Sequence, residues 1–213
     1  MIDVRMFTVG PVAENSFLFR QDGSTEAIIV DPGDEAPKLL GAIDELGLDL
    51  QAILLTHTHF DHVGAVAPVA KATGAPVYCP KLEVPVLQDI MSFVPWPGFG
   101  PFESWDPEET VEGGEQLQLA GLDIDVIFTP GHSPGHVTYA VEDALFSGDV
   151  LFEGSVGRTD LPGGDWAVLS RSIESLLDRY PDEQRVFPGH MGLTTLGRER
   201  ATNPFLTEIT QRS

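Results

Sequence analysis

The spacing of apolar residues changes along the chain and divides it into short strands and longer helices. Residues 2–9, 16–20 and 26–31 form three strand-like runs separated by Gly10-Pro11 and by a polar turn at 21–24, which predicts a meander. Apolar residues at 39, 40, 43 and 46, and again at 63, 66, 69 and 70, repeat with a helical period that stops at Gly47 and Gly74. With a further strand at 52–56 between these helices, the first half is predicted to be a mixed sheet with helices on one face.

The second half of the chain has a similar order of elements. Strands are expected at 116–119, 123–129, 137–141, 144–146 and 185–187, and a helix at 165–180 carries its apolar residues on one face behind Asp165 as N-cap. A final helical stretch follows. Strands that end in polar residues with metal-binding chemistry occur in both halves, so we expect two facing sheets whose polar ends meet at one rim.

The stretch from 83 to 112 lacks a regular period, and residues 93–105 place five aromatic residues among Pro and Gly. Loops of this length usually have a role. Two interpretations stay open: the stretch covers a sheet edge, or it forms an apolar wall or lid over an active site.

The densest group of candidate ligands follows the strand at 52–56. His57, His59, Asp61 and His62 stand within seven residues, and three of the six histidines of the chain are among them. Imidazole and carboxylate are common ligands of zinc, iron and manganese. Chance clustering of structural histidines is a poor explanation for this spacing, so we expect two neighbouring metal positions.

Other strand ends carry further donors, each behind a glycine that lets the backbone turn. His132, Asp149 and His190 are the candidates for the metal centre. Asp31 stands before Pro-Gly, either as a turn residue or as a carboxylate that orients a ligating imidazole. His136 is either a structural imidazole or a partner of a ligand.

Composition limits the function classes. The chain has 213 residues, 42% of them hydrophobic, and a formal net charge of -21, which repels nucleic acids and anionic membrane surfaces. Its one cysteine, Cys79, excludes an internal disulfide and is interpreted as a small buried residue. The amino terminus has no signal-peptide pattern and no stretch has the length of a membrane span, so we expect a cytoplasmic protein.

The HxHxDH pattern at 57–62, followed by the later His, Asp and His, resembles the metallo-β-lactamase superfamily over nearly the whole chain. This resemblance implies an α/β fold, a four-layer αβ/βα sandwich of two mixed sheets with helices on the outer faces, formed by residues 1–213 as one domain. It implies two divalent metal ions, zinc with iron or manganese as alternatives. By resemblance the first ion is held by His57, His59, His132 and Asp149, and the second by Asp61, His62, Asp149 and His190, with Asp149 bridging.

An aspartate at the bridging position is similar to the hydrolase branch that includes glyoxalase II. Arg158 stands where a basic residue of glyoxalase II contacts glutathione, which implies an anion-binding role, with a structural salt bridge as the alternative. Because little sequence follows His190, we expect no helical carboxy-terminal domain of the kind found in the longer glyoxalase II enzymes. The chain resembles the short bacterial glyoxalase II-like proteins, which share residues 157–160 and terminal stretches like 194–200 and 203–205.

The implied reaction is hydrolysis of a small anionic thioester, such as S-lactoylglutathione, by a hydroxide held between the two metals and oriented by Asp61. Residues 157–160 are also similar to persulfide dioxygenases, which use one iron, and the superfamily includes lactone, ester and β-lactam hydrolases. These activities stay alternatives. A scaffold without turnover is disfavoured because a closed structural zinc site needs four ligands and this chain offers seven. The sequence does not indicate an oligomeric state.

Overall fold

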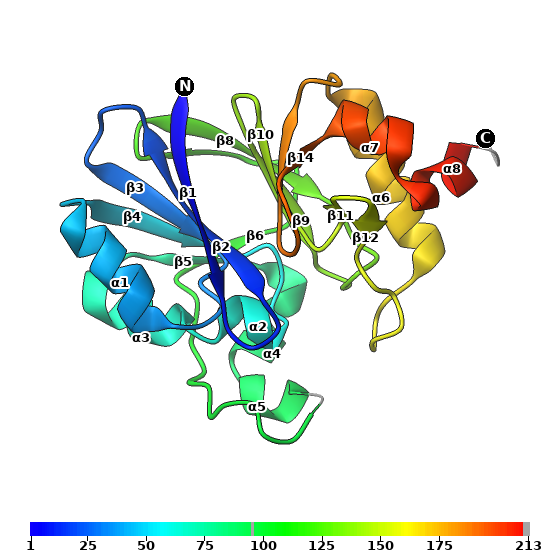
Figure 1. Ribbon diagram of the computed structural model, residues 1–213. Helices are drawn as coiled ribbons and strands as arrows, with labels where there is room; N and C mark the ends of the chain where they lie inside the picture. The colour runs from blue at the N-terminus through cyan, green and yellow to red at the C-terminus, as the bar shows by residue number, and fades with distance from the viewer. Residues whose placement is uncertain (95, 211–213) are drawn as a thin grey trace.

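The computed structural model describes residues 1–94 and 96–210, and within them two six-stranded sheets face each other. Figure 1 shows α1 and α3 on the outer side of the first sheet and α6 and α7 on the outer side of the second. The layers follow one another as helix, sheet, sheet and helix. The predicted αβ/βα sandwich of two mixed sheets is therefore confirmed.

The first sheet has the strand order β1-β2-β3-β4-β5-β6. Its strands are β1 (Ile2–Val9), β2 (Glu14–Gln21), β3 (Glu26–Val30), β4 (Asp49–Leu54), β5 (Val77–Pro80) and β6 (Glu109–Val111). The first three are antiparallel, as expected of a meander, and β3 to β6 run parallel. Helix α1 (Ala36–Glu45) joins β3 to β4, and α2 (Phe60–Val63) and α3 (Val66–Thr73) join β4 to β5. Because parallel strands end at the same edge, the polar residues after β3 and β4 lie side by side.

The second sheet has the order β14-β13-β10-β9-β8-β7. Its strands are β7 (Gln116–Leu119), β8 (Leu122–Phe128), β9 (Val137–Val141), β10 (Ala144–Gly148), β13 (Arg185–Pro188) and β14 (Thr194–Thr195), and β11 (Leu151–Phe152) pairs separately with β12 (Ser155–Val156). Helix α6 (Trp166–Arg179) begins at Asp165, whose carboxylate accepts the backbone N–H of Val168 at 3.0 Å, so the predicted N-cap is confirmed. Helices α7 (Leu196–Thr202) and α8 (Pro204–Thr210) are the expected final helical stretch.

Three apolar clusters hold the layers together. The cluster between the sheets combines aliphatic with aromatic side chains, and the rings of Phe19 and Phe146 stack there with centroids 4.6 Å apart. The outer clusters place Leu39 of α1 against the first sheet and Ile173 of α6 against the second. Each such side chain contributes about 1.5–3 kcal/mol by leaving water. This packing fixes the two sheets so that their polar strand ends meet.

The irregular stretch of 83–112 contains more structure than its sequence predicts. It begins with the last residue of a 3-10 turn, η1 (Lys81–Glu83), and includes α4 (Val84–Leu87), α5 (Ile90–Phe93) and β6. Helices of four residues are too short to show a helical period, so the sequence did not predict α4 and α5. The strand predicted at 52–56 ends earlier, at Leu54, so the candidate ligands begin on irregular backbone.

Two smaller expectations concern burial and membranes. Cys79 lies buried and unpaired in β5, where burial raises the pKa of its thiol, so the prediction of a small buried residue is confirmed. Within residues 1–94 and 96–210, no helix combines the length and apolar character that crossing a membrane requires.

Candidate metal centre

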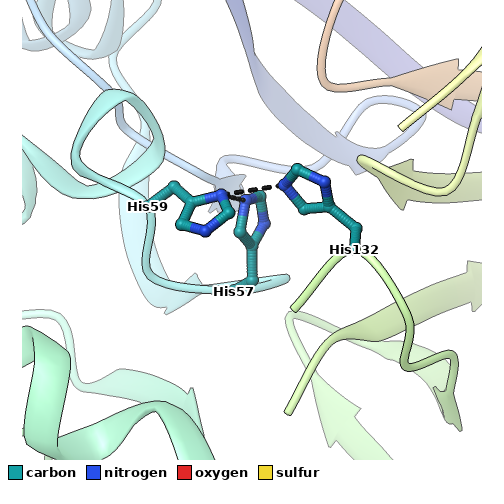
Figure 2. Close-up of side chains that lie close together, drawn as sticks. All are labelled: His57, His59 and His132. Carbon is teal, nitrogen blue, oxygen red and sulfur yellow. Dashed lines mark hydrogen bonds between the residues drawn. The ribbon is translucent and has the colours of Figure 1, made fainter. Parts of the chain in front are cut away.

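Three imidazoles from the two sheets converge at the rim. His57 and His59 follow β4, and His132 lies on the loop between β8 and β9. The Nδ1 atom of His59 lies 3.1 Å from Nε2 of His57 and 2.8 Å from Nε2 of His132. Figure 2 shows these nitrogens directed toward one another. Nitrogens in this arrangement are suited to a single metal ion, and this is the first group of predicted ligands.

A second group lies beside the first. Asp61 and His62 belong to α2, and His190 follows β13. An oxygen of Asp61 lies 3.3 Å from Nε2 of His190 and 3.8 Å from Nε2 of His62. The structure thus brings together the side chains of the predicted second position.

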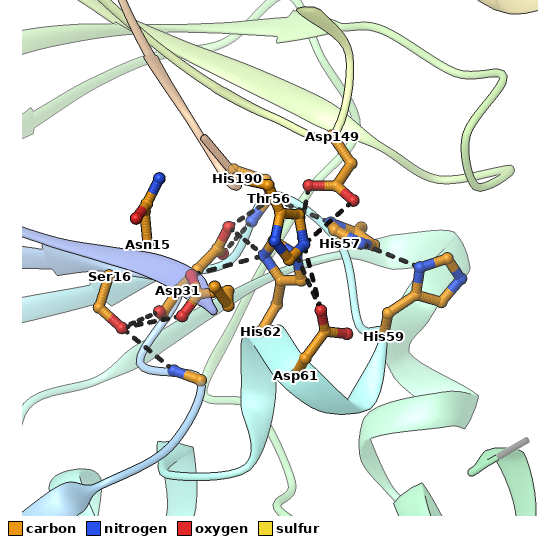
Figure 3. Close-up of polar contacts among 12 residues, drawn as sticks. Asn15, Ser16, Asp31, Thr56, His57, His59, Asp61, His62, Asp149 and His190 are labelled. Atoms are coloured by element: carbon orange, nitrogen blue, oxygen red, sulfur yellow. Dashed lines mark hydrogen bonds and ion pairs between the residues drawn. The ribbon is translucent and has the colours of Figure 1, made fainter. Parts of the chain in front are cut away.

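Asp149, at the end of β10, lies between the two groups (Figure 3). Its Oδ2 is 3.4 Å from Nε2 of His132 in the first group and 3.7 Å from Nε2 of His190 in the second. Its Oδ1 is 3.3 Å from Nε2 of His62. A carboxylate in this place is able to contact both metal positions, as expected of a bridge.

Two buried atoms of this centre support its fit to metal ions. Among the described residues, His62 Nε2 and Asp149 Oδ1 are buried without a hydrogen-bond partner. Such atoms usually cost about 1–3 kcal/mol each, so their presence at a rim of imidazoles and carboxylates fits atoms that face a cation. Gly189 leaves space beside these two side chains, because a Cβ at this position would lie 2.4 Å from Asp149 Oδ1 and 2.6 Å from the ring of His62. The donor set and the space both fit divalent ions.

The ring nitrogens on the far side of the imidazoles are held by the protein. Nδ1 of His62 lies 3.0 Å from Oδ2 of Asp31, and the same oxygen accepts the hydroxyl of Thr56 at 2.6 Å. That hydroxyl lies 3.0 Å from Nδ1 of His57. Two backbone carbonyls do the same for two further rings: that of Arg158 lies 2.7 Å from Nδ1 of His132, and that of Ala13 lies 3.3 Å from Nδ1 of His190. These contacts fix which nitrogen faces the centre.

Asp31 is thus placed to orient His62, which favours the second of its two interpretations. Its φ is 47°, a left-handed conformation that aspartate tolerates better than most residues. His136 is buried, and its Nε2 accepts the backbone N–H of Asp149 at 3.0 Å while Nδ1 lies 3.1 Å from the hydroxyl of Thr129. His136 therefore positions the backbone of Asp149 and lies outside both ligand groups.

The imidazoles of the centre have pKa values shifted in opposite directions. Burial, together with neighbouring imidazoles, lowers the pKa of His57 well below its usual value and lowers the pKa of His59 to about 4. Burial acts in the same direction on His62, but the carboxylates of Asp149 and Asp61 outweigh it and raise its pKa. Burial opposes ionisation of Asp149 too, yet the imidazole of His62 and then that of His132 hold the pKa of its carboxyl well below the usual range. Asp149 is therefore ionised, as a metal ligand must be.

Two buried side chains that the sequence analysis did not identify, Glu83 and Asn15, hold the loops that carry the candidate ligands. The carboxylate of Glu83 accepts Ser133 Oγ and the backbone N–H of Gly135, both at 2.7 Å, and the hydroxyl of Thr58 at 2.9 Å. It therefore ties the loop of His132 to the loop of His57 and His59.

Asn15, at the start of β2, does the same for the loop of His190. Its side-chain amide donates to the carbonyls of Pro188 at 3.1 Å and Met191 at 2.9 Å, and its backbone N–H donates to Gly189 at 2.7 Å. The adjacent Glu14 is also buried, 3.7 Å from Nδ1 of His62. Burial raises the pKa of Glu14 well above its usual value. Three consecutive polar residues, 14–16, between apolar runs were the available signal for this cluster.

Arg158 lies at the surface near the aromatic stretch. Its guanidinium forms a two-bond ion pair with Asp160 at 2.6 and 2.7 Å and lies 6.0 Å from the centroid of the Trp96 ring. This ion pair is the structural salt bridge that the sequence analysis gave as the alternative role of Arg158. It occupies the guanidinium group that the anion-binding role requires. Contact with a substrate anion stays a prediction. Pro95, within the stretch 93–105, lies outside the described residues.

Comparison with known proteins places the chain in a family. The model of the metallo-beta-lactamase superfamily matches residues 9–190. The chain is 39% identical over 209 residues to the probable metallo-hydrolase YqgX of Bacillus subtilis, covering 95% of this chain and 96% of that protein. It is 37% identical over 193 residues to hydroxyacylglutathione hydrolase GloC of Haemophilus influenzae, covering 87% and 89%.

Solved structures agree with these sequence relationships. The crystal structure of the B3 metallo-beta-lactamase BLEG-1 has a TM-score of 0.91 and 39% identity, covering 96% of this chain and 100% of that one. The structure of TTHA1623 in a di-iron-bound form has a TM-score of 0.84 and 44% identity, covering 95% and 100%. The chain belongs to the metallo-β-lactamase superfamily of metal-dependent hydrolases.

Proposed function

We propose that this metallo-hydrolase cleaves a thioester of the hydroxyacylglutathione type and that it uses two divalent ions. The observation that carries the proposal is the pair of ligand groups with Asp149 between them, joined by the 37% identity to GloC. His57, His59 and His132 would hold one ion, Asp61, His62 and His190 the other, and Asp149 both. When bound, such a pair of ions supplies a water of lowered pKa and a Lewis acid for the thioester carbonyl.

The protein's own residues would position and protect this chemistry. Asp61 lines a cleft and has an oxygen at the edge of the centre, so it is placed to accept a hydrogen bond from the attacking water and orient it. Although burial opposes its ionisation, the imidazole of His62 helps to keep the pKa of Asp61 below its usual value, so it is an acceptor at neutral pH. A thiolate leaves readily because thiols have a pKa of about 8.5, so no strong general acid is required.

The identity to BLEG-1 supports a second candidate within the same chemistry. That protein is a B3 metallo-beta-lactamase and is 39% identical to this chain. Opening a β-lactam and cleaving a thioester both begin with attack of water on an activated carbonyl, so one centre is able to serve both. The two candidates differ in the shape of the substrate that the surface beside the centre would accept.

The test combines metal analysis with substrate comparison. Protein loaded separately with zinc, iron and manganese should hold close to two ions per chain and should hydrolyse S-lactoylglutathione faster than a chromogenic cephalosporin. Asp149→Ala should lose both ions, whereas Asp165→Ala, which alters only a helix N-cap, should keep both and serves as the matched control. A plateau at one iron, with oxygen uptake on glutathione persulfide and no thioester hydrolysis, would overturn the proposal in favour of a dioxygenase.

A further inference from the structure

A cleft of about 380 Å³ opens beside the second ligand group. It is bounded by the β1–β2 turn at 9–12, by the start of α1, by α2 with the residues after it, and by part of the aromatic stretch at 98–102. Asp61 belongs to its wall and also to the ligand group of His62 and His190. The cleft therefore adjoins the centre at Asp61, and its volume is within the range of small-molecule sites.

Three aromatic side chains, Phe60, Phe99 and Phe102, line the cleft together with aliphatic residues, glycines and two aspartates. The Phe60 ring lies 4.9 Å from that of Phe99 and 5.8 Å from that of Phe102, measured between centroids. Val9 and Val12 of the β1–β2 turn line the same cleft. The aromatic and aliphatic part of these walls would stabilise an apolar group by removing its surface from water.

The charges of the cleft have one sign. Among the described residues that line it, the charged side chains are Asp34 and Asp61, and none is Lys or Arg. Two ions at the centre would offset the charge of Asp61, but Asp34 lies outside both ligand groups. A carboxylate placed in this cleft would thus meet a like charge in a protein whose net charge is -21.

From this geometry we infer that the cleft is a specificity subsite for one uncharged, apolar arm of the thioester, either the acyl or the thiol arm. The inference rests on the proposed thioester hydrolysis and adds which kind of substrate the centre selects. Trp96 stands between the two parts of the surface: its ring is 6.1 Å from Phe60 and 6.1 Å from Phe99 on the cleft side, and 6.0 Å from the Arg158 guanidinium on the other. An anionic group belongs on the Arg158 side, away from the cleft.

The test uses thioesters in which one arm is varied at a time. The acyl arm is acetyl, butanoyl, hexanoyl or succinyl on N-acetylcysteamine, and the thiol arm is lengthened or carboxylated in a parallel set with a constant acetyl group. For one of the two arms, each longer apolar group should lower KM, and the carboxylated group should raise it. If lengthening neither arm lowers KM, the cleft is not a subsite.

Variants locate the effect in the cleft. Phe99→Ala should raise KM for the longest apolar arm about five- to tenfold by removing aromatic contact area. Phe93→Ala is the matched control, because Phe93 is an aromatic residue of the same stretch that is 55% exposed and does not line the cleft. Asp34→Asn should lower KM for the carboxylated arm about threefold by removing the like charge, a larger change than for the uncharged arms. Equal effects of Phe99→Ala and Phe93→Ala would overturn the assignment.

Failure of the subsite is distinguishable from failure of the proposed function. If the metal-loaded protein hydrolyses none of the thioesters, the proposed function is wrong. Thioethers with a methylene in place of the carbonyl then test the cleft alone by calorimetry. Tighter binding of the longer apolar thioethers, weakened by Phe99→Ala and not by Phe93→Ala, supports the subsite; the absence of that order refutes it.

Discussion

Replacing Glu83 by alanine should separate the two ligand loops that its carboxylate joins. Oε1 accepts Ser133 Oγ and the N–H of Gly135 at 2.7 Å each, and Oε2 accepts Thr58 Oγ1 at 2.9 Å. The residue is 4% exposed, so water does not easily replace these bonds. Glu83→Ala leaves the Ser133 hydroxyl and the Gly135 N–H without their acceptor in a buried place, and it leaves the Thr58 hydroxyl only the backbone carbonyl of residue 83 at 3.3 Å.

The size of the effect follows from these contacts. A hydrogen bond to a charged group contributes about 1.5–3 kcal/mol, and a buried donor left without a partner costs a similar amount. Removing the carboxylate also ends the cost of burying its charge, which offsets part of the loss. We therefore expect Glu83→Ala to lower the free energy of unfolding of the metal-free protein by about 3 kcal/mol, a large part of the 5–15 kcal/mol typical of a domain.

Glu83→Gln is the matched control because it keeps the size and one acceptor oxygen. Its carbonyl oxygen is able to keep the bonds to Ser133 and Gly135, and its amide meets the Thr58 hydroxyl, which accepts as well as donates. Urea unfolding measures the stability of each metal-free variant, and cobalt titration followed by absorption measures occupancy of the histidine-rich first group. The alanine variant should lose about 10–100-fold in cobalt affinity at that group, with most of it kept by glutamine. A loss below about 1 kcal/mol with an unchanged cobalt titration would refute the role given to Glu83.

Three other changes test the remaining parts of the centre. Asn15→Ala removes the donors to the carbonyls of Pro188 and Met191, so metal analysis should show the second ion bound about 10–100-fold more weakly with the first retained. Gly189→Ala places a Cβ 2.4 Å from Asp149 Oδ1, so the folded variant should fail to hold two ions, as elemental analysis would show. Asp160→Asn removes the charge that pairs with Arg158, so KM for anionic thioesters should fall about threefold, and Arg158→Ala should abolish that gain.

The sequence predicted the fold wherever an element was long enough to show its period. The helix at 165–180 appears within a residue or two of its predicted bounds because it has a clear buried face. The strand at 2–9 also has its predicted bounds, which Gly10-Pro11 marks at its end, although only Ile2 and Val9 of the strand are buried. The helices α4 and α5 have four residues each and leave no such pattern. Edge strands such as β14, with two residues, are formed by pairing with a neighbour and not by local preference.

The candidate ligands were predictable for a different reason. Histidine and aspartate at strand ends have a recognisable chemistry, and all seven predicted ligands lie in the two groups and the carboxylate between them. The residues that hold the loops were not predictable in the same way. Glu83 contacts residues 25, 50 and 52 positions away in the sequence, so neither its neighbours nor a local period indicates its partners.

The position of the centre between the sheets links metal binding to the fold. His57, His59, Asp61 and His62 follow the first sheet's β4, whereas the other three predicted ligands follow strands of the second sheet. Ions bound only in this arrangement would stabilise the folded protein by mass action, by about 4 kcal/mol for each site at a thousandfold excess over Kd. The β1–β2 turn contacts both the cleft and the metal centre. Val12 lines the cleft, and the carbonyl of the next residue, Ala13, lies 3.3 Å from His190 Nδ1. An occupant that shifts this turn must change the affinity of the second group for its ion, and by reciprocity the ion must change the affinity of the cleft by the same factor.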